Sequence, residues 1–219
     1  MTIKKLAVAC VAAGLLIASP AEAKSHKQDT KVKATVALGA KKPAVNAKAK
    51  AASAKKSGKA KVAQVPVCTN TDVMPTPQNV EVVRAAILCL HNQIRVQAGL
   101  PALKANAKLQ KAATGQSNDM VVNGYFDHTS PDGDTFVDRI VGAGYVKRND
   151  GWTLGENLAW GTGDLSTPQG VMDAWMNSAG HKANILKKAY HEVGIGIKLG
   201  VPTDNGVGAT ITADFGTKL

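Results

Sequence analysis

The chain has few aromatic residues, few cysteines and few long apolar runs. Aromatic side chains make up 4% of its 219 residues, and residues 24–63 contain none. Because that stretch also holds twelve lysines and a single acid, Asp29, it lacks the apolar surface from which a core forms. The apolar run from Leu6 to Ala18 is shorter than the roughly 20 residues that a transmembrane helix needs. These absences argue against a membrane anchor and place the folded part after residue 63.

The first 23 residues have the pattern of a secretory signal peptide. Lys4 and Lys5 precede the apolar run, and Ala21-Glu22-Ala23 has the small-x-small pattern of a cleavage site. Cys10 lies near the start of the run, which argues against lipid attachment at that cysteine. We therefore predict that residues 1–23 are removed on export, leaving a secreted, extracellular protein without a transmembrane anchor.

The positive charge of the chain is concentrated in residues 24–63, which we predict to form a disordered Lys/Ala-rich tail. The whole chain has a formal net charge of +11, whereas residues 64–219 carry 13 basic and 14 acidic side chains. The folded part therefore gives no reason to expect nucleic-acid binding. The tail has two interpretations: it retains the protein on anionic envelope polymers, or it is a solvated spacer.

Two cysteines, Cys68 and Cys89, remain after signal cleavage. An even number of cysteines in an exported protein predicts one disulfide. Closing a loop of about twenty residues stabilises a fold by roughly 3 kcal/mol in the chain-entropy model. A redox-active pair is the alternative, but the spacing is far from the C-x-x-C arrangement of reactive dithiols.

Residues 64–219 predict one α+β domain. Apolar residues recur at the helical period in two long segments, and shorter helices follow, one of them capped by Ser166. Alternation of period two, with a turn at Asp204-Asn205-Gly206, predicts an antiparallel hairpin near the C-terminus. Asn92 and Arg95 are placed to hydrogen-bond neighbouring backbone. The predicted helices are 79–98, 106–123, 135–143 and about 167–178; the predicted strands are 153–160, 193–199 and 207–215.

Five short motifs follow one another along the predicted domain: NQIR at 92–95 with GLP at 99–101, HTSPDG at 128–133, GENLA at 155–159, WMNSAGHKANIL at 175–186 and EVGIG at 192–196. In this order and spacing they resemble the bacterial branch of the CAP superfamily, also called the SCP domain, which includes cysteine-rich secretory and pathogenesis-related proteins. The resemblance implies a three-layer α-β-α sandwich with a small antiparallel sheet between helices, and an extracellular or envelope-associated location. We expect a monomer.

The resemblance also implies a central cleft in which two histidines and two acids can hold a divalent metal. His128, Glu156 and His181 match three of these four residues. The second acid is missing, because Met, Asn and Ser occupy positions 176–178. Two imidazoles and one carboxylate can bind zinc with one position open, although no cofactor is required by the fold. The alternative is a hydrogen-bonded polar cluster that orders the walls of the cleft.

Other polar residues have weaker assignments. Glu192, at the start of a predicted strand, is a candidate for the missing carboxylate. Ser178 lies three residues before His181 and is a candidate nucleophile, although a serine there more naturally ends a helix. We expect His91 and His191 at the surface. The three tryptophans are expected to pack in the core or the cleft wall.

The function expected from these residues is that of a noncatalytic extracellular or envelope-associated binding module, whose cleft takes a small apolar or envelope-derived ligand. No H-E-x-x-H or G-x-S-x-G motif is present, and no residue is assigned to catalysis. The first alternative is a divalent-metal-dependent hydrolase that uses His128, Glu156 and His181. The second is a polyanion-binding protein in which the tail supplies the activity.

Overall fold

A computed structural model describes residues 64–203 and 206–219. The predicted signal peptide and basic tail lie outside these residues. In the described part no helix has the length and apolar character to cross a membrane. The elements, in chain order, are α1 (Val80–Gln97), β1 (Lys104–Ala105), α2 (Ala107–Asn123), α3 (Phe136–Gly142), β2 (Trp152–Thr162), the 3-10 turn η2 (Gly163–Ser166), α4 (Pro168–Met176), α5 (Ala179–Ile185), β3 (Glu192–Leu199) and β4 (Gly208–Lys218).

Four strands form one sheet in the order β1-β3-β4-β2. β4 is antiparallel to both neighbours, and the short β1 runs parallel to β3. The predicted hairpin of β3 and β4 is therefore confirmed. The strand expected at 153–160 is longer than predicted and pairs with β4 along its whole length. Sequence patterns did not reveal β1, because two residues are too few to show alternation.

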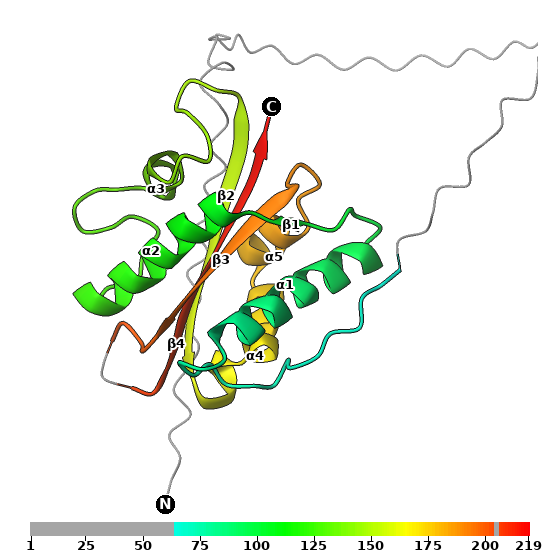
Figure 1. The fold of residues 1–219 in the computed structure, drawn as a ribbon, viewed down its shortest axis with the longest axis vertical. Coiled ribbons are helices and arrows are strands. Elements are labelled where there is room, and N and C mark those ends of the chain that lie inside the picture. The colour runs from blue at the N-terminus through cyan, green and yellow to red at the C-terminus, as the bar shows by residue number, and fades with distance from the viewer. Residues whose placement is uncertain (1–63, 204–205) are drawn as a thin grey trace, which may run out of the picture. The chain divides into compact units, whose positions relative to one another are not determined.

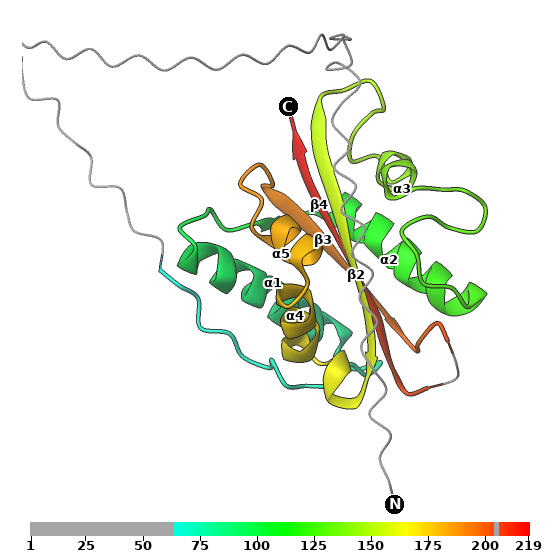
Figure 2. The same ribbon diagram turned by 180° about the vertical axis from the view of Figure 1, so that it is seen from behind.

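Helices cover both faces of the sheet, so the expected three-layer α-β-α sandwich is confirmed. α1, α4 and α5 lie on one side of the strands, and α2 and α3 lie on the other (Figures 1 and 2). We call these two sides the α1 face and the α2 face. Alternate residues of each strand point to opposite faces, so neighbouring positions such as Glu156 and Asn157 serve different layers.

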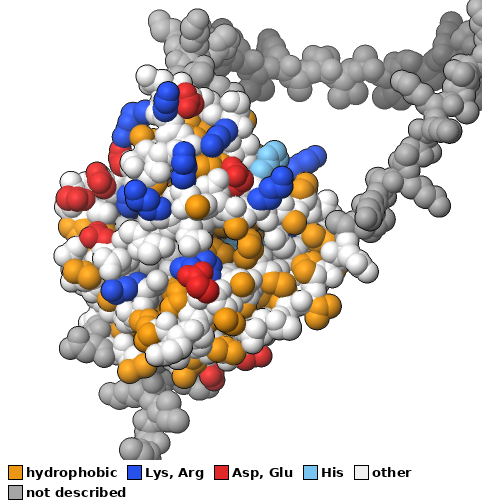
Figure 3. All heavy atoms as spheres, viewed as in Figure 1, with side chains coloured by type: hydrophobic (Ala, Val, Ile, Leu, Met, Phe, Trp, Pro, Cys, Tyr) orange, Lys and Arg blue, Asp and Glu red, His pale blue; other side chains and the backbone are white. Residues whose placement is uncertain are grey.

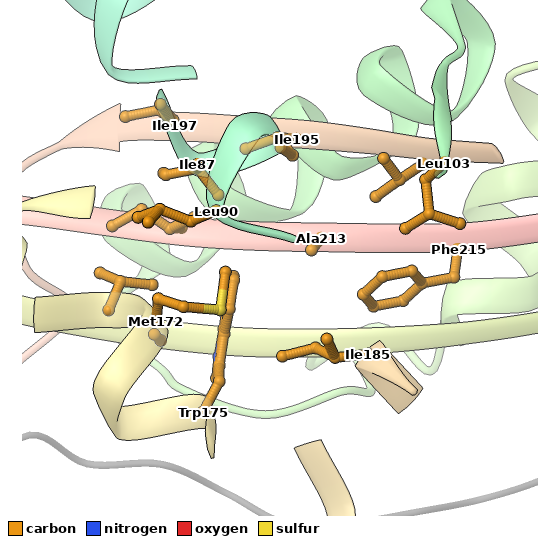
Figure 4. Packing of buried hydrophobic residues seen from close by; sticks show 14 of the residues in the cluster. Ile87, Leu90, Leu103, Met172, Trp175, Ile185, Ile195, Ile197, Ala213 and Phe215 are labelled. Carbon is orange, nitrogen blue, oxygen red and sulfur yellow. The ribbon is translucent and has the colours of Figure 1, made fainter. Parts of the chain in front are cut away.

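The α1 face is packed with large apolar side chains (Figure 4). Trp175 is fully buried there, and its indole Nε1 donates to the Leu158 carbonyl at 2.9 Å. Burying a side chain of this size is worth several kcal/mol, since truncating a buried tryptophan typically costs about 3–5 kcal/mol. The strand residues that contribute to this face are Ala159, Val193, Ile195, Ile197, Ala209, Ile211, Ala213 and Phe215.

The α2 face combines a smaller apolar cluster, which includes Leu109, Ile140 and Trp152, with close approach of α2 to the backbone of β3. A Cβ atom on Gly194 would lie 2.0 Å from the amide nitrogen of Gln110, and one on Gly196 would lie 2.2 Å from the carbonyl carbon of Ala113. Side chains of any size at these two positions would therefore push α2 off the sheet. The glycines that alternate with apolar residues in β3 place this helix directly on the strand.

Polar side chains of α1 hold the loops around it, as predicted. Arg95 is buried and donates to four carbonyl oxygens, among them Pro101 at 2.9 Å and Tyr190 at 3.0 Å. Asn92 accepts from the Leu103 amide at 2.7 Å and donates to its carbonyl at 3.0 Å. These contacts fix the segment before β1 and the segment before β3 (Glu192–Leu199) relative to α1.

His91 is not at the surface, contrary to expectation. It is fully buried, its Nδ1 lies 2.8 Å from the Ile87 carbonyl, and its ring stands between Trp175 and Phe215. The helical period that buries Ile87 carries the neighbouring face of α1 inward as well. Burial, opposed by the bond to Ile87, lowers the pKa of His91 to about 4. His191 is exposed, as expected.

The helix boundaries follow local capping, with two departures from the predictions. Thr167 rather than Ser166 caps α4, accepting from the Gly170 amide at 3.1 Å. The fourth helix ends at Met176, and a separate helix, α5, follows with Ser178 as its N-cap residue. Cys68 and Cys89 form the predicted disulfide, which joins the segment before α1 to that helix.

Candidate functional site

Glu156 is the centre of a buried polar cluster on the α2 face. It lies in the middle of β2, and only 1% of its side chain is exposed. Its Oε1 accepts from His128 Nδ1 at 2.8 Å, and its Oε2 accepts from Arg139 Nη2 at 2.9 Å. A carboxylate oxygen only accepts, so this contact places the imidazole proton of His128 on Nδ1. The structure therefore brings together two of the three residues predicted for the cleft.

Arg139, which the sequence analysis did not select, organises the cluster. It extends from α3, a helix fixed at its start by a capping box between Thr135 and Asp138. Besides Glu156, its guanidinium donates to the His128 carbonyl at 3.0 Å and the Asp134 carbonyl at 2.9 Å. A single side chain thus joins α3, the loop at 128–134 and strand β2.

Asp214 supplies a second carboxyl group beside Glu156. The two residues are direct neighbours across β2 and β4, and Asp214 is fully buried. Burial and the neighbouring Glu156 carboxylate raise the pKa of Asp214 well above its usual range, while Arg139 acts in the opposite direction. Folding therefore favours the neutral acid form of Asp214. One signal for it was available, since it is the only acid in a strand otherwise built mostly of Ala, Thr, Ile, Phe and Gly.

His181 is buried on α5, which is bonded to the strand that carries Glu156. Asn157 Nδ2 donates to the His181 carbonyl at 3.1 Å, and Asn184 Nδ2 donates to the Glu156 carbonyl at 3.2 Å. Ser178 stands at the start of the same helix, in the boundary role that was the alternative to a nucleophile. Side-chain amides thus join residues 155–157 of β2 to residues 180–184 of α5.

Glu192 does not supply the missing carboxylate, so that prediction is wrong. Its Oε2 accepts from Tyr145 Oη at 2.6 Å, and its Oε1 accepts from Asn106 Nδ2 at 2.8 Å. It faces the same layer as Asp214 but lies two residues along β3 from Gly194, the partner of Asp214 in the sheet. The extra carboxyl group comes from β4 instead.

The arrangement around Glu156 does not fit the zinc site predicted from His128, Glu156 and His181. Both carboxylate oxygens are engaged, one of them by a guanidinium that already supplies a positive charge. Within residues 64–203 and 206–219, no group of three or more His, Cys, Asp or Glu side chains is placed to hold a metal ion. Arg139 already supplies the positive charge that balances the Glu156 carboxylate.

Comparison with known proteins gives consistent similarities. The model of the family described as CAP, the cysteine-rich secretory protein family, matches residues 88–211. The chain is 36% identical over 128 residues to the uncharacterized protein YkwD of Bacillus subtilis (strain 168), covering 58% of this chain and 47% of that protein. It is 34% identical over 119 residues to the uncharacterized membrane protein YlbC of the same strain, covering 54% and 32%. The chain thus spans less than half the length of these curated relatives.

Two solved structures share the fold. The first is an extracellular protein containing a SCP domain from Bacillus anthracis str. Ames, with a TM-score of 0.51 and 26% identity, covering 64% of this chain and 43% of that one. The second is an outer surface protein from Borrelia burgdorferi, with a TM-score of 0.50 and 20% identity, covering 67% and 97%. The second likeness concerns the fold alone.

Proposed function

Given that the chain belongs to the CAP family of cysteine-rich secretory proteins, we propose that it is a noncatalytic, extracellular binding domain for a small, largely apolar ligand of the cell envelope. The extracellular location is supported by its likeness to the Bacillus anthracis protein, whose description calls it extracellular. The expected disulfide is present and agrees with an oxidising compartment.

The engagement of Glu156 carries the noncatalytic part of the proposal. A general base has to reach the proton that it removes, directly or through one water. Here 1% of the Glu156 side chain is exposed, and both of its oxygens accept hydrogen bonds from His128 and Arg139. The cluster is therefore suited to holding β2, α3 and the 128–134 loop in one arrangement, which was the structural alternative to a metal site.

The ligand is assigned to a groove along α1 rather than to the cleft expected near His128, Glu156 and His181. This α1 groove has a volume of about 400 Å³, within the range of small-molecule sites. Exposed apolar side chains continue around it, with Val67 91% and Val82 42% exposed. Hydrophobic side chains gather over this side of the molecule in Figure 3. The lining residues are Gln64, Pro66, Ala85, Leu88, Cys89, Asn92, Val96 and Ala102.

Ligand capture tests the proposal. The secreted chain is incubated with an envelope lipid extract, separated from unbound lipid and measured by mass spectrometry. We expect a retained apolar species for the wild type and little for Ala85→Trp, since Ala85 lies in the groove wall. Ala183→Trp, on the exposed surface of α5, is the matched control and should retain the ligand. If the wild type retains nothing, the proposal fails.

The metal-dependent hydrolase is tested by calorimetric titration with zinc. We expect negligible heat for the wild type and for the His128→Ala/His181→Ala variant, because Arg139 already balances Glu156. Zinc binding by the wild type that disappears in the double variant would favour the hydrolase instead.

Retention by the basic tail stays a prediction. Deleting residues 24–63 should reduce binding to anionic cell envelopes at low salt, and the difference should shrink as salt rises. Equal retention with and without the tail would leave the spacer interpretation.

A further inference from the structure

A second pocket adjoins the α1 groove and differs from it in charge. It has a volume of about 390 Å³, and Ala102 lines both the pocket and the groove. Because Ala102 is small and exposed, a bound molecule can extend across it from one depression to the other. The lining residues of this second pocket are Pro101, Ala102, Lys104, His191, Glu192, Thr217 and Lys218.

From this juxtaposition we infer that the ligand is an anionic amphiphile, with its apolar chain in the α1 groove and a carboxylate or phosphate head group against Lys104 and Lys218. The inference rests on the proposed function, since it names the ligand class of the same groove. Blue and pale-blue side chains lie beside the gathered hydrophobic ones in Figure 3.

The two ammonium groups are available to an anion. Within the described residues, neither Lys104 nor Lys218 has a carboxylate oxygen within 4.0 Å. Lys218 Nζ lies 4.9 Å from the centroid of the Tyr145 ring, and the exposed His191 adds a further donor. An ammonium ion forms strong, charge-assisted hydrogen bonds with carboxylate or phosphate oxygens. The pocket therefore offers the chemistry of an anion site.

Glu192 is the one acidic side chain that lines this pocket, and its negative charge would repel an anionic head group. Its contacts within the protein weaken that repulsion. Burial pushes its pKa up, but hydrogen bonds from Tyr145 and Asn106 and the nearby Lys218 and Lys104 outweigh this, so the pKa lies below its usual value. Both of its oxygens are bonded within the protein, at 2.6 and 2.8 Å. Two lysines against one bonded carboxylate leave the pocket with a net positive charge.

The segment between groove and pocket is held rigidly by α1, the helix that also forms the groove. Arg95 donates to the Pro101 carbonyl at 2.9 Å, and Asn92 bonds both backbone groups of Leu103. The Lys104 amide donates to the His191 carbonyl at 2.9 Å. Head-group and chain sites are thus fixed relative to one another before a ligand arrives, which lowers the entropic cost of binding.

The experiment compares three probes that share a ten-carbon chain and differ in head group: decanoate, decan-1-ol and decylamine. Binding to the full secreted chain is measured by calorimetry at neutral pH. For the wild type we expect decanoate to bind about tenfold more tightly than decan-1-ol, as two partly exposed ionic contacts allow. In Lys104→Gln/Lys218→Gln this preference should disappear while decan-1-ol binds as before.

A matched control removes the same charge elsewhere. Lys182→Gln/Lys198→Gln keeps both pocket lysines, because Lys182 is on α5 and Lys198 is at the opposite end of β3 from Glu192. It should keep the preference for decanoate. Loss of the preference in both double variants, equal binding of decanoate and decan-1-ol by the wild type, or tighter binding of decylamine would each overturn the head-group assignment while leaving the groove intact. Binding of none of the three probes would contradict the proposed function itself.

Discussion

The two faces of the sheet are built by different means. The α1 face buries large apolar side chains around Trp175. The α2 face has a smaller apolar cluster around Leu109 and Trp152, and adds bare backbone contact at Gly194 and Gly196 and a buried polar cluster around Glu156. On the first face, a truncated apolar side chain leaves a cavity that its neighbours can partly fill. On the second face, an added side chain collides with the backbone of α2, and the loss of a polar side chain leaves a buried charge without its partner. The α2 face should therefore tolerate fewer substitutions.

The largest effect is expected from Gly196→Val. The new Cβ would lie 2.2 Å from backbone atoms of Ala113, which cannot move without displacing α2. We expect a loss of more than about 4 kcal/mol in the free energy of unfolding, enough to prevent folding in a marginally stable domain. Yield and urea unfolding measure it. Gly115→Ala, where no atom lies within 4 Å, is the control and should gain up to about 1 kcal/mol. A well-folded Gly196→Val would refute the backbone contact.

Arg139→Met should destabilise by about 3–5 kcal/mol, because it leaves the buried Glu156 carboxylate without its cation. Urea unfolding at neutral pH measures the loss. Arg148→Met is the control: this arginine pairs with Asp138, but its side chain is 61% exposed, so the cost should stay below about 1 kcal/mol. Adding Glu156→Gln to Arg139→Met should recover part of the stability. Equal losses for Arg139→Met and Arg148→Met would show that the cluster is not a structural centre.

A change of pH should alter the free energy of unfolding in opposite directions through the two faces. On the α1 face the titrating group is His91. Its pKa falls from 6.5 to about 4 on folding, so the unfolded chain takes up a proton in this window and the folded chain does not. Stability from the neutral imidazole is present above pH 6.5 and is lost as the pH falls towards 4, by about 3 kcal/mol. The difference in unfolding free energy between wild type and His91→Leu should show this slope. His191→Leu, at an exposed histidine, is the control, and its difference in unfolding free energy from the wild type should not show this slope.

An effect of opposite sign is expected from Asp214→Asn on the α2 face. Burial and the Glu156 carboxylate raise the pKa of Asp214, so the folded chain holds a proton that the unfolded chain has released. This contribution is complete at acid pH and is lost as the pH rises through the raised pKa. The asparagine resembles the neutral acid in shape and does not titrate. The stability of the variant relative to the wild type should therefore increase as the pH rises. A constant difference in unfolding free energy across the pH range would contradict the raised pKa.

The elements of the fold were largely predictable, because each has a local signature. Apolar residues at helical spacing placed α1 and α2 within two residues of their ends, and alternation placed β3 and β4 in the correct pairing. The errors arose where no local pattern exists. β1 consists of two residues, and the break between α4 and α5 is a local change to extended backbone at Ser178, which the apolar periodicity does not show.

The site was predictable only in part. Family motifs indicated His128 and Glu156, and the two side chains meet. Arg139 and Asp214 were missed because their role depends on tertiary contacts: one reaches across from α3, and the other becomes a neighbour of Glu156 only through the register of β2 and β4. The burial of His91 likewise follows from packing between Trp175 and Phe215. Spacing along the chain contains none of this information.

The disulfide has a mechanical consequence. Cys68 lies near the start of the described segment, and its partner Cys89 lies in the middle of α1. Tension applied through the residues before Cys68 passes across the covalent bridge into the middle of α1, bypassing residues 69–88. If those preceding residues are held by a surface while the domain is pulled by flow, the load reaches the core helix directly and the intervening loop stays slack.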